Sequence, residues 1–155
     1  MTKRYVNIIC LALLIISYGC STTNNKDYNL ITNYVKKNFN GYNTKKQSCI
    51  LLLTENGCIP CNRMYAKFIQ DRFINKDNAY IVLCASGSIV DIKPFIFNDS
   101  IKNVCEDEKE IFTKEIYPYS AAILIKENKV DTIIQITSTN IEKTFDYIFG
   151  EYNNQ

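Results

Sequence analysis

Residues 49–61 read Cys-Ile-Leu-Leu-Leu-Thr-Glu-Asn-Gly-Cys-Ile-Pro-Cys. The run at 49–53 is uninterrupted and apolar, which predicts a strand that is covered on both faces of a sheet. A stripe of mainly apolar residues at helical spacing follows and predicts a helix that begins near Cys58. The stripe consists of Cys61, Met64, Tyr65, Phe68, Ile69, Arg72 and Phe73. A buried strand that leads into an amphipathic helix is half of a βαβ unit, so the sequence predicts an α/β protein.

Cys58 and Cys61 lie three positions apart at the predicted start of this helix. That spacing brings the two sulfurs together within one turn, where a disulfide can close. Free backbone N–H groups and the helix dipole at a helix N-terminus lower the pKa of a thiol, and the thiolate is the reactive form. Pro60 is tolerated in a first helical turn because its missing N–H has no partner there. The motif therefore indicates a redox-active cysteine pair.

The rest of the chain predicts one domain at residues 28–150 and a short tail at 151–155. Two pairs of residues, Asp107 with Glu110 and Thr139 with Glu142, have the spacing of capping boxes that open helices. The order of elements predicts a sandwich with a mixed central sheet. The further predicted elements are a helix at 28–39, strands at 79–85 and 102–105, a helix from 107 to about 115, strands at 121–125 and 130–137 joined as an antiparallel hairpin, and a last helix that ends at Gly150.

The composition excludes several classes of function. The 155 residues include no His, which excludes Ser/His/Asp and Cys/His hydrolysis as well as His-ligated metal sites. After residue 20 the chain carries 16 basic and 16 acidic residues, so it lacks the basic surface of a nucleic-acid-binding protein. Structural zinc needs four ligands and no second CxxC is present, so we expect no metal. The sequence also predicts no cofactor.

Residues 1–20 have the pattern of a secretory signal peptide. Lys3 and Arg4 precede an apolar segment at 6–16, which as a helix rises only about 17 Å and is too short to span a bilayer. Residues 17–20 read Ser-Tyr-Gly-Cys and resemble the lipobox of bacterial lipoproteins, in which the cysteine is lipidated. We expect Cys20 to be the lipid anchor and 21–27 to be a tether, which places the domain outside the cytoplasm in the cell envelope. An ordinary cleaved signal peptide is the alternative.

The CxxC motif at a strand-to-helix junction, Tyr117-Pro118 before a hairpin and the closing amphipathic helix together resemble the thioredoxin-like family. The resemblance covers residues 28–150 and implies a three-layer α/β sandwich with a mixed central sheet. The long segment between Ala85 and Pro118 resembles the insertion of membrane-anchored thiol-disulfide oxidoreductases of the bacterial cell envelope. Clients would be envelope proteins that carry disulfides or dithiols, and a membrane electron donor would regenerate the pair.

By this resemblance, Cys58 is the nucleophile and Cys61 is the resolving thiol. Pro118 corresponds to a cis-proline packed against the disulfide, and the Tyr117 backbone would pair with an extended client segment. These assignments make Cys58 and Cys61 the catalytic residues, and Tyr117 and Pro118 the substrate-binding residues.

The chain departs from the family pattern at two positions. Gly57 stands where the family has a Trp, and Leu52 stands where thioredoxin has a buried carboxylate. Glu55 is the nearest candidate for proton transfer. Without a cationic His between the two cysteines, we expect a reducing or intermediate couple.

One alternative is a thioredoxin-fold lipoprotein that acts as a binding or scaffold module, with a structural disulfide between Cys58 and Cys61. The other cysteines do not help to decide between an oxidoreductase and a scaffold module. Cys49 and Cys84 are predicted at opposite ends of neighbouring strands, too far apart to bond. Cys105 is predicted to be a bystander, with an extra thiol near the active site as the alternative.

Overall fold

The computed structural model describes residues 23–42, 47–96 and 101–153, with side chains from residue 27 to residue 151. The predicted leader and Cys20 lie outside these residues. None of the helices in the described ranges is long and apolar enough to cross a bilayer.

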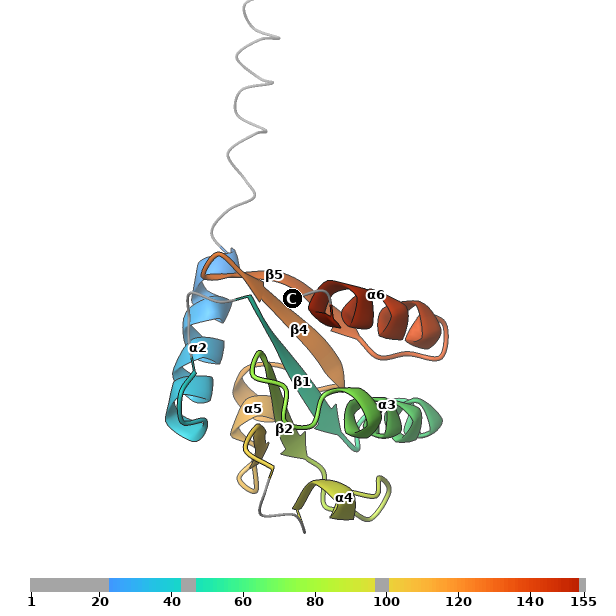
Figure 1. The fold of residues 1–155 in the computed structure, drawn as a ribbon. Coiled ribbons are helices and arrows are strands. Elements are labelled where there is room, and N and C mark those ends of the chain that lie inside the picture. The colour runs from blue at the N-terminus through green and yellow to red at the C-terminus, as the bar shows by residue number, and fades with distance from the viewer. Residues whose placement is uncertain (1–22, 43–46, 97–100, 154–155) are drawn as a thin grey trace, which may run out of the picture.

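The described residues form an α/β fold around a five-stranded mixed sheet (Figure 1). The strand order is β3-β2-β1-β4-β5. The first three of these neighbours are parallel, whereas β4 runs antiparallel to β1 and β5 antiparallel to β4. The strands are β1 (Ser48–Thr54), β2 (Ala79–Cys84), β3 (Val104–Glu106), β4 (Ala121–Lys126) and β5 (Lys129–Gln135).

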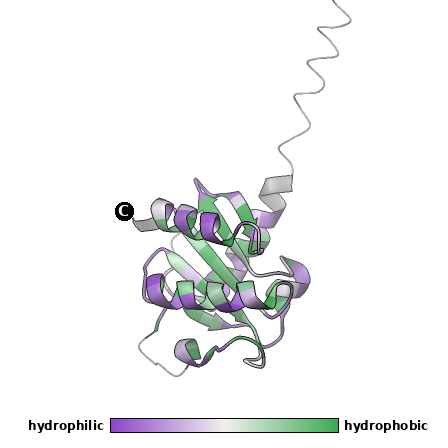
Figure 2. Ribbon diagram, turned by 90° about the vertical axis from the view of Figure 1, so that its right-hand side faces the viewer, coloured by the Kyte–Doolittle hydropathy of each residue, from purple (hydrophilic) through white to green (hydrophobic). Residues whose placement is uncertain are grey.

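Helices cover both faces of the sheet, which gives three layers (Figure 1). One face packs against α3 (Ile59–Arg72) and α6 (Ile141–Asn153), with the short α4 (Lys93–Ile96) beside them. The other face packs against α2 (Thr23–Asn38) and α5 (Ile111–Glu115). The sheet is coloured mainly as hydrophobic in Figure 2, and the helices in front of it carry hydrophilic residues.

Strand β1 lies in the middle of the sheet, and all seven of its residues are buried. Successive side chains of a strand point to opposite faces. Leu51 and Leu53 accordingly join the core under α3 and α6, whereas Ile50 and Leu52 join the core under α2 and α5. The prediction of a strand covered on both faces is confirmed, because the apolar run supplies both cores.

Most of the predicted elements are present. The hairpin is confirmed, and its turn consists of Glu127 and Asn128, both with positive φ (50° and 59°). Two central residues with positive φ make a type I′ turn, whose twist matches that of paired strands. Because the turn is this tight, β4 and β5 extend into the connection predicted at 126–129.

The first predicted capping box is wrong, because the helix begins at Ile111 and not after Asp107. Glu110 has a left-handed backbone (φ 55°), and its N–H donates to the Asp107 carbonyl oxygen at 2.8 Å, which closes a turn before the helix. The Asp107 carboxylate still caps the helix, since its Oδ2 accepts the Phe112 N–H at 2.6 Å.

The boundaries of the last helix also differ from the prediction. It begins at Ile141, after a turn in which Asn140 Oδ1 accepts the Thr137 N–H at 2.9 Å, so the predicted pairing of Thr139 with Glu142 does not open it. Gly150 lies inside α6, which continues to Asn153. Glu151 pairs with Lys126 of β4 at 2.7 Å, and this contact holds the final turn against the sheet.

Candidate functional site

Cys58 and Cys61 form a disulfide at the N-terminus of α3, with their Cα atoms 5.2 Å apart. Cys58 is the N-cap residue and has an extended backbone (φ −77°, ψ 101°). Its carbonyl oxygen accepts the Asn62 N–H at 2.9 Å, which starts the helical hydrogen bonding. Cys58 is half-buried, whereas Cys61 is only 3% exposed. A reacting partner therefore reaches Cys58 first.

The N-terminus of α3 favours a negative charge. No side chain caps it, and its first turn contains no acidic residue. Unsatisfied N–H groups and the helix dipole place partial positive charge beside Cys58. A thiolate released from the disulfide at this position is stabilised relative to one in water.

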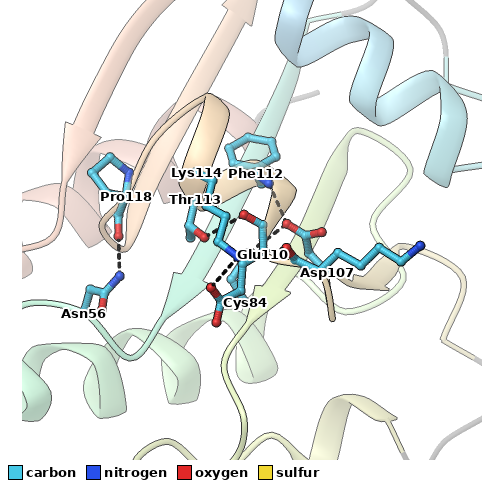
Figure 3. Close-up of polar contacts among 9 residues, drawn as sticks. Asn56, Cys84, Asp107, Glu110, Phe112, Thr113, Lys114 and Pro118 are labelled. Carbon is cyan, nitrogen blue, oxygen red and sulfur yellow. Dashed lines mark hydrogen bonds and ion pairs between the residues drawn. The ribbon is translucent and has the colours of Figure 1, made fainter.

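The segment that contains Pro118 lies beside the loop at 55–58, which we call the cysteine loop. The two are far apart in the sequence. Asn56 Nδ2 donates to the Pro118 carbonyl oxygen at 2.9 Å across a separation of 62 residues (Figure 3). Gly57 has a φ of +89°, and a Cβ placed there would lie 3.6 Å from Tyr119 Cδ1. Gly57 thus permits the left-handed turn, and the 3.6 Å distance is an ordinary van der Waals contact that places the Tyr119 ring beside this loop.

The prediction of a cis bond between Tyr117 and Pro118 is wrong, because all peptide bonds of the described residues are trans. Trans is the lower-energy isomer unless tertiary contacts favour cis. Here the Tyr117 N–H donates to the Phe112 carbonyl oxygen at 3.0 Å, which continues the hydrogen bonding of α5 up to the proline. The Tyr117 hydroxyl donates to Gln135 Oε1 at 3.3 Å, and burial raises the pKa of that hydroxyl.

Glu55 lies in the loop between β1 and α3, and its carboxylate binds the segment that follows β2. It accepts hydrogen bonds from the Ile89 N–H at 2.9 Å and from the hydroxyls of Ser86 at 2.8 Å and Ser88 at 3.1 Å. Desolvation raises the pKa of Glu55, but these hydrogen bonds outweigh it and lower the pKa to about 2. An ionised carboxylate with that pKa is a weak base. The contacts give Glu55 a structural role, and proton transfer by it stays a prediction.

Sequence reasoning missed Asn62, a buried polar residue that directly follows Cys61 in α3. Its side chain is 1% exposed, and its Nδ2 donates to the Asn56 carbonyl oxygen at 3.0 Å. Its Oδ1 is buried and has no hydrogen-bond partner among the described residues. The available signal was position, since Asn62 is four residues after Cys58 and therefore on the same side of the helix as the nucleophile.

The other three cysteines of the described residues, Cys49, Cys84 and Cys105, carry free thiols. Cys49 pairs with Ala79 at one end of the sheet, and Cys84 pairs with Thr54 at the other, which confirms that the two are too far apart to bond. Cys105 is half-buried on the edge strand β3, where it neighbours Val82. It belongs to the core on the face of the sheet opposite to α3, so it is not an extra thiol beside the disulfide.

Sequence reasoning also missed a cluster of polar groups around Cys84 and Cys105, on the face of the sheet covered by α2 and α5. The Cys84 Sγ–H donates to Asp107 Oδ2 at 3.4 Å (Figure 3), and the Tyr34 hydroxyl lies 4.0 Å from Cys105 Sγ. Burial, followed by the charge of Asp107, raises the pKa of Cys84, and burial also raises the pKa of Cys105. Within the described ranges, no three His, Cys, Asp or Glu side chains are arranged as metal ligands.

Comparison of the chain with protein-family models, with curated proteins and with solved structures finds no match.

Proposed function

We propose that this protein is a thiol-disulfide oxidoreductase with a thioredoxin-like fold, which exchanges disulfides with envelope proteins in the reducing direction. The observation that carries the proposal is the disulfide at the start of α3, where Cys58 is half-buried and Cys61 is 3% exposed. A purely structural disulfide needs no difference in access between its two sulfurs.

The topology supports the thioredoxin-like assignment. The CxxC motif joins the central strand β1 to α3, β4 of the β4–β5 hairpin runs antiparallel to β1, and α6 packs on the same face of the sheet as α3. The Pro118 segment precedes β4 and contacts the cysteine loop. The insertion after β2 supplies the short helices α4 and α5 and the edge strand β3.

The reaction runs through a mixed disulfide. In the reduced protein, the Cys58 thiolate attacks one sulfur of a client disulfide, forms a Cys58–client bond and releases the other client sulfur, which takes a proton. The Cys61 thiolate then attacks Cys58 Sγ, which breaks the mixed disulfide and releases the second client thiol. Two electrons pass to the client, and the Cys58–Cys61 bond is restored. An external dithiol must reduce that bond before the next cycle.

The surroundings of Cys58 favour a reducing or intermediate potential. A strongly oxidising couple needs extra stabilisation of the thiolate. Arg63 is the nearest candidate cation along the helix, and its Nε donates to the Ile89 carbonyl oxygen at 2.9 Å, which directs the guanidinium toward the segment after β2. The helix terminus therefore remains as the main stabilising feature at Cys58.

Client binding beside Pro118 would use few backbone groups. The Tyr117 N–H is bonded to Phe112, Pro118 has no N–H, and the Pro118 carbonyl oxygen accepts Asn56. The Tyr117 carbonyl oxygen is thus the backbone group that we assign to pairing with a client strand. Ile59 and Tyr119, each 41% exposed, supply apolar surface on the two segments.

The envelope location rests on the leader sequence and on Cys20, both outside the described residues. A lipid-anchored protein in that compartment meets exported proteins with disulfides or dithiols and receives electrons from a membrane donor. Disulfides persist in such oxidising compartments, where a reductant has clients to act on.

The proposal is tested by reduction of insulin with dithiothreitol as the electron source. The wild-type protein is expected to accelerate reduction, and Cys58→Ser is expected to abolish the acceleration. Cys61→Ser that has been reduced and then freed of dithiothreitol is expected to stop at the mixed disulfide, which mass spectrometry detects as insulin bound at Cys58. Cys105→Ser, a free thiol on the other face of the sheet, is the control and should retain full activity. No acceleration by the wild-type protein would instead support a binding or scaffold module.

A further inference from the structure

Two asparagine side chains link the CxxC helix to the Pro118 segment in series. Asn62, in the first turns of α3, donates from Nδ2 to the Asn56 carbonyl oxygen at 3.0 Å. Asn56 then donates from its own Nδ2 to the Pro118 carbonyl oxygen at 2.9 Å (Figure 3). Residues 56 and 57 directly precede the nucleophile, so this relay runs from the helix, past Cys58, to the proline.

Other contacts join the same two segments deeper in the protein. The Thr54 N–H donates to Ser120 Oγ at 2.9 Å, and the buried Tyr65 hydroxyl of α3 donates to the Ala121 carbonyl oxygen at 2.9 Å. These contacts align the ends of β1 and β4. Pro118 and Asn56 lie beyond them on the exposed side, and in the described part of the chain their hydrogen bond is what joins the outer ends of the two segments.

Asn62 is poorly suited to a purely apolar packing role. It is 1% exposed, and its Oδ1 lacks a partner among the described residues. A buried amide oxygen without a hydrogen bond costs free energy, which a leucine of similar shape would not. The side chain nevertheless faces the loop before Cys58, where its Nδ2 binds Asn56. This placement indicates that its contribution lies in positioning the loop.

We propose that Asn62 and Asn56 are positioning residues that set the spacing between Cys58 and Pro118, and that this spacing determines how well a protein client docks across both segments. The inference rests on the function proposed above. A protein client contacts Cys58 and the Pro118 segment together, whereas a small disulfide needs little beyond Cys58. Loss of the relay should therefore affect a protein client more than a small disulfide.

The test compares the reduction of insulin with that of oxidised glutathione, with dithiothreitol as the electron source in both. In Asn56→Ala, the ratio of kcat/KM for insulin to kcat/KM for glutathione should fall about fivefold, mainly through the KM for insulin, as expected for one hydrogen bond. Asn62→Leu should give a similar fall. Because both variants break the same path, the double variant should also fall about fivefold and not about 25-fold.

Asn38→Ala is the matched control. The Asn38 side chain is exposed and donates from Nδ2 to the Tyr34 carbonyl oxygen at 2.8 Å on α2, against the other face of the sheet. The control should leave the insulin-to-glutathione ratio unchanged. Thermal melting of each variant separates unfolding from mispositioning, and Asn56→Ala keeps the test valid if Asn62→Leu fails to fold, because Asn56 is exposed.

Two outcomes would overturn the relay alone. In the first, the wild-type protein reduces both disulfides and Asn56→Ala keeps the same ratio as Asn38→Ala. In the second, the double variant falls about 25-fold, which would show that the two asparagines act independently. A wild-type protein that reduces neither disulfide would overturn the proposed function together with the relay.

Discussion

Two groups of cysteines lie on opposite faces of one sheet, in opposite chemical environments. Cys58 and Cys61 are at the uncapped N-terminus of α3, next to partial positive charge. Cys84 and Cys105 are in the core under α2 and α5, and the Cys84 thiol donates a hydrogen bond to the Asp107 carboxylate. A helix terminus favours the thiolate, whereas burial beside a carboxylate favours the thiol. We therefore expect position in the fold, and not the number of cysteines, to decide which sulfurs react.

The largest expected effect is on thiol reactivity. In the reduced protein at pH 7, Cys58 should react with iodoacetamide at least about 100-fold faster than Cys84, because the thiolate is the nucleophile and the pKa of Cys84 is raised. Mass spectrometry of the alkylated peptides over time measures both rates. Equal alkylation rates at Cys58 and Cys84 would contradict the expected difference in thiol reactivity between the two faces of the sheet.

A smaller effect is expected from Asp107→Ala. The Asp107 carboxylate accepts the buried Phe112 N–H, so its loss should lower the free energy of unfolding by about 2 kcal/mol. The same change should speed alkylation of Cys84, because the neighbouring negative charge contributes to its raised pKa. Urea unfolding and alkylation rates give the two readouts.

Glu108→Ala is the matched control for Asp107→Ala, since Glu108 is the exposed neighbour of Asp107. It should change the free energy of unfolding by less than about 0.5 kcal/mol. If Asp107→Ala slowed alkylation of Cys84, the account of that thiol would be wrong.

The smallest effect concerns Glu55, in the loop between β1 and α3. Glu55→Gln should cost about 1 kcal/mol of stability at pH 7, discounted for partial exposure to solvent. The folded-state pKa of Glu55 is about 2, below its usual 4.5, so this stability is present above pH 4.5 and is lost as the pH falls toward 2. Denaturant unfolding of both proteins at several pH values measures the difference. Unchanged stability with slowed insulin reduction would instead support proton transfer by Glu55.

The sequence predicted the parts of the fold that depend on local patterns. The apolar run at 49–53 and the helical stripe after Cys58 were enough to place β1, α3 and the disulfide between them. The cap pairs failed because a left-handed Glu110 and the side chain of Asn140 closed turns that spacing alone does not reveal. The α6 helix passed Gly150 because a tertiary ion pair from Glu151 holds its last turn.

The candidate site was predictable only in part. Cys58 and Cys61 follow from a three-residue spacing, but the contact of Asn56 with Pro118 joins positions 62 residues apart. No local pattern reports such a contact. The role of Asn62 depends on its burial, and the environment of Cys84 depends on Asp107 on a neighbouring strand end. These features arise from tertiary contacts between residues that are far apart in the chain. Such contacts leave no recognisable spacing pattern in a single sequence.

The proposed activity requires the Cys58–Cys61 pair to cycle between disulfide and dithiol. Equilibration of the protein in glutathione and dithiothreitol buffers, followed by alkylation and mass spectrometry of residues 58–61, measures its reduction potential. We expect a single two-electron midpoint of about −270 to −180 mV, the range of reducing and intermediate couples. A midpoint near −120 mV, or a disulfide that stays closed throughout the range, would contradict it.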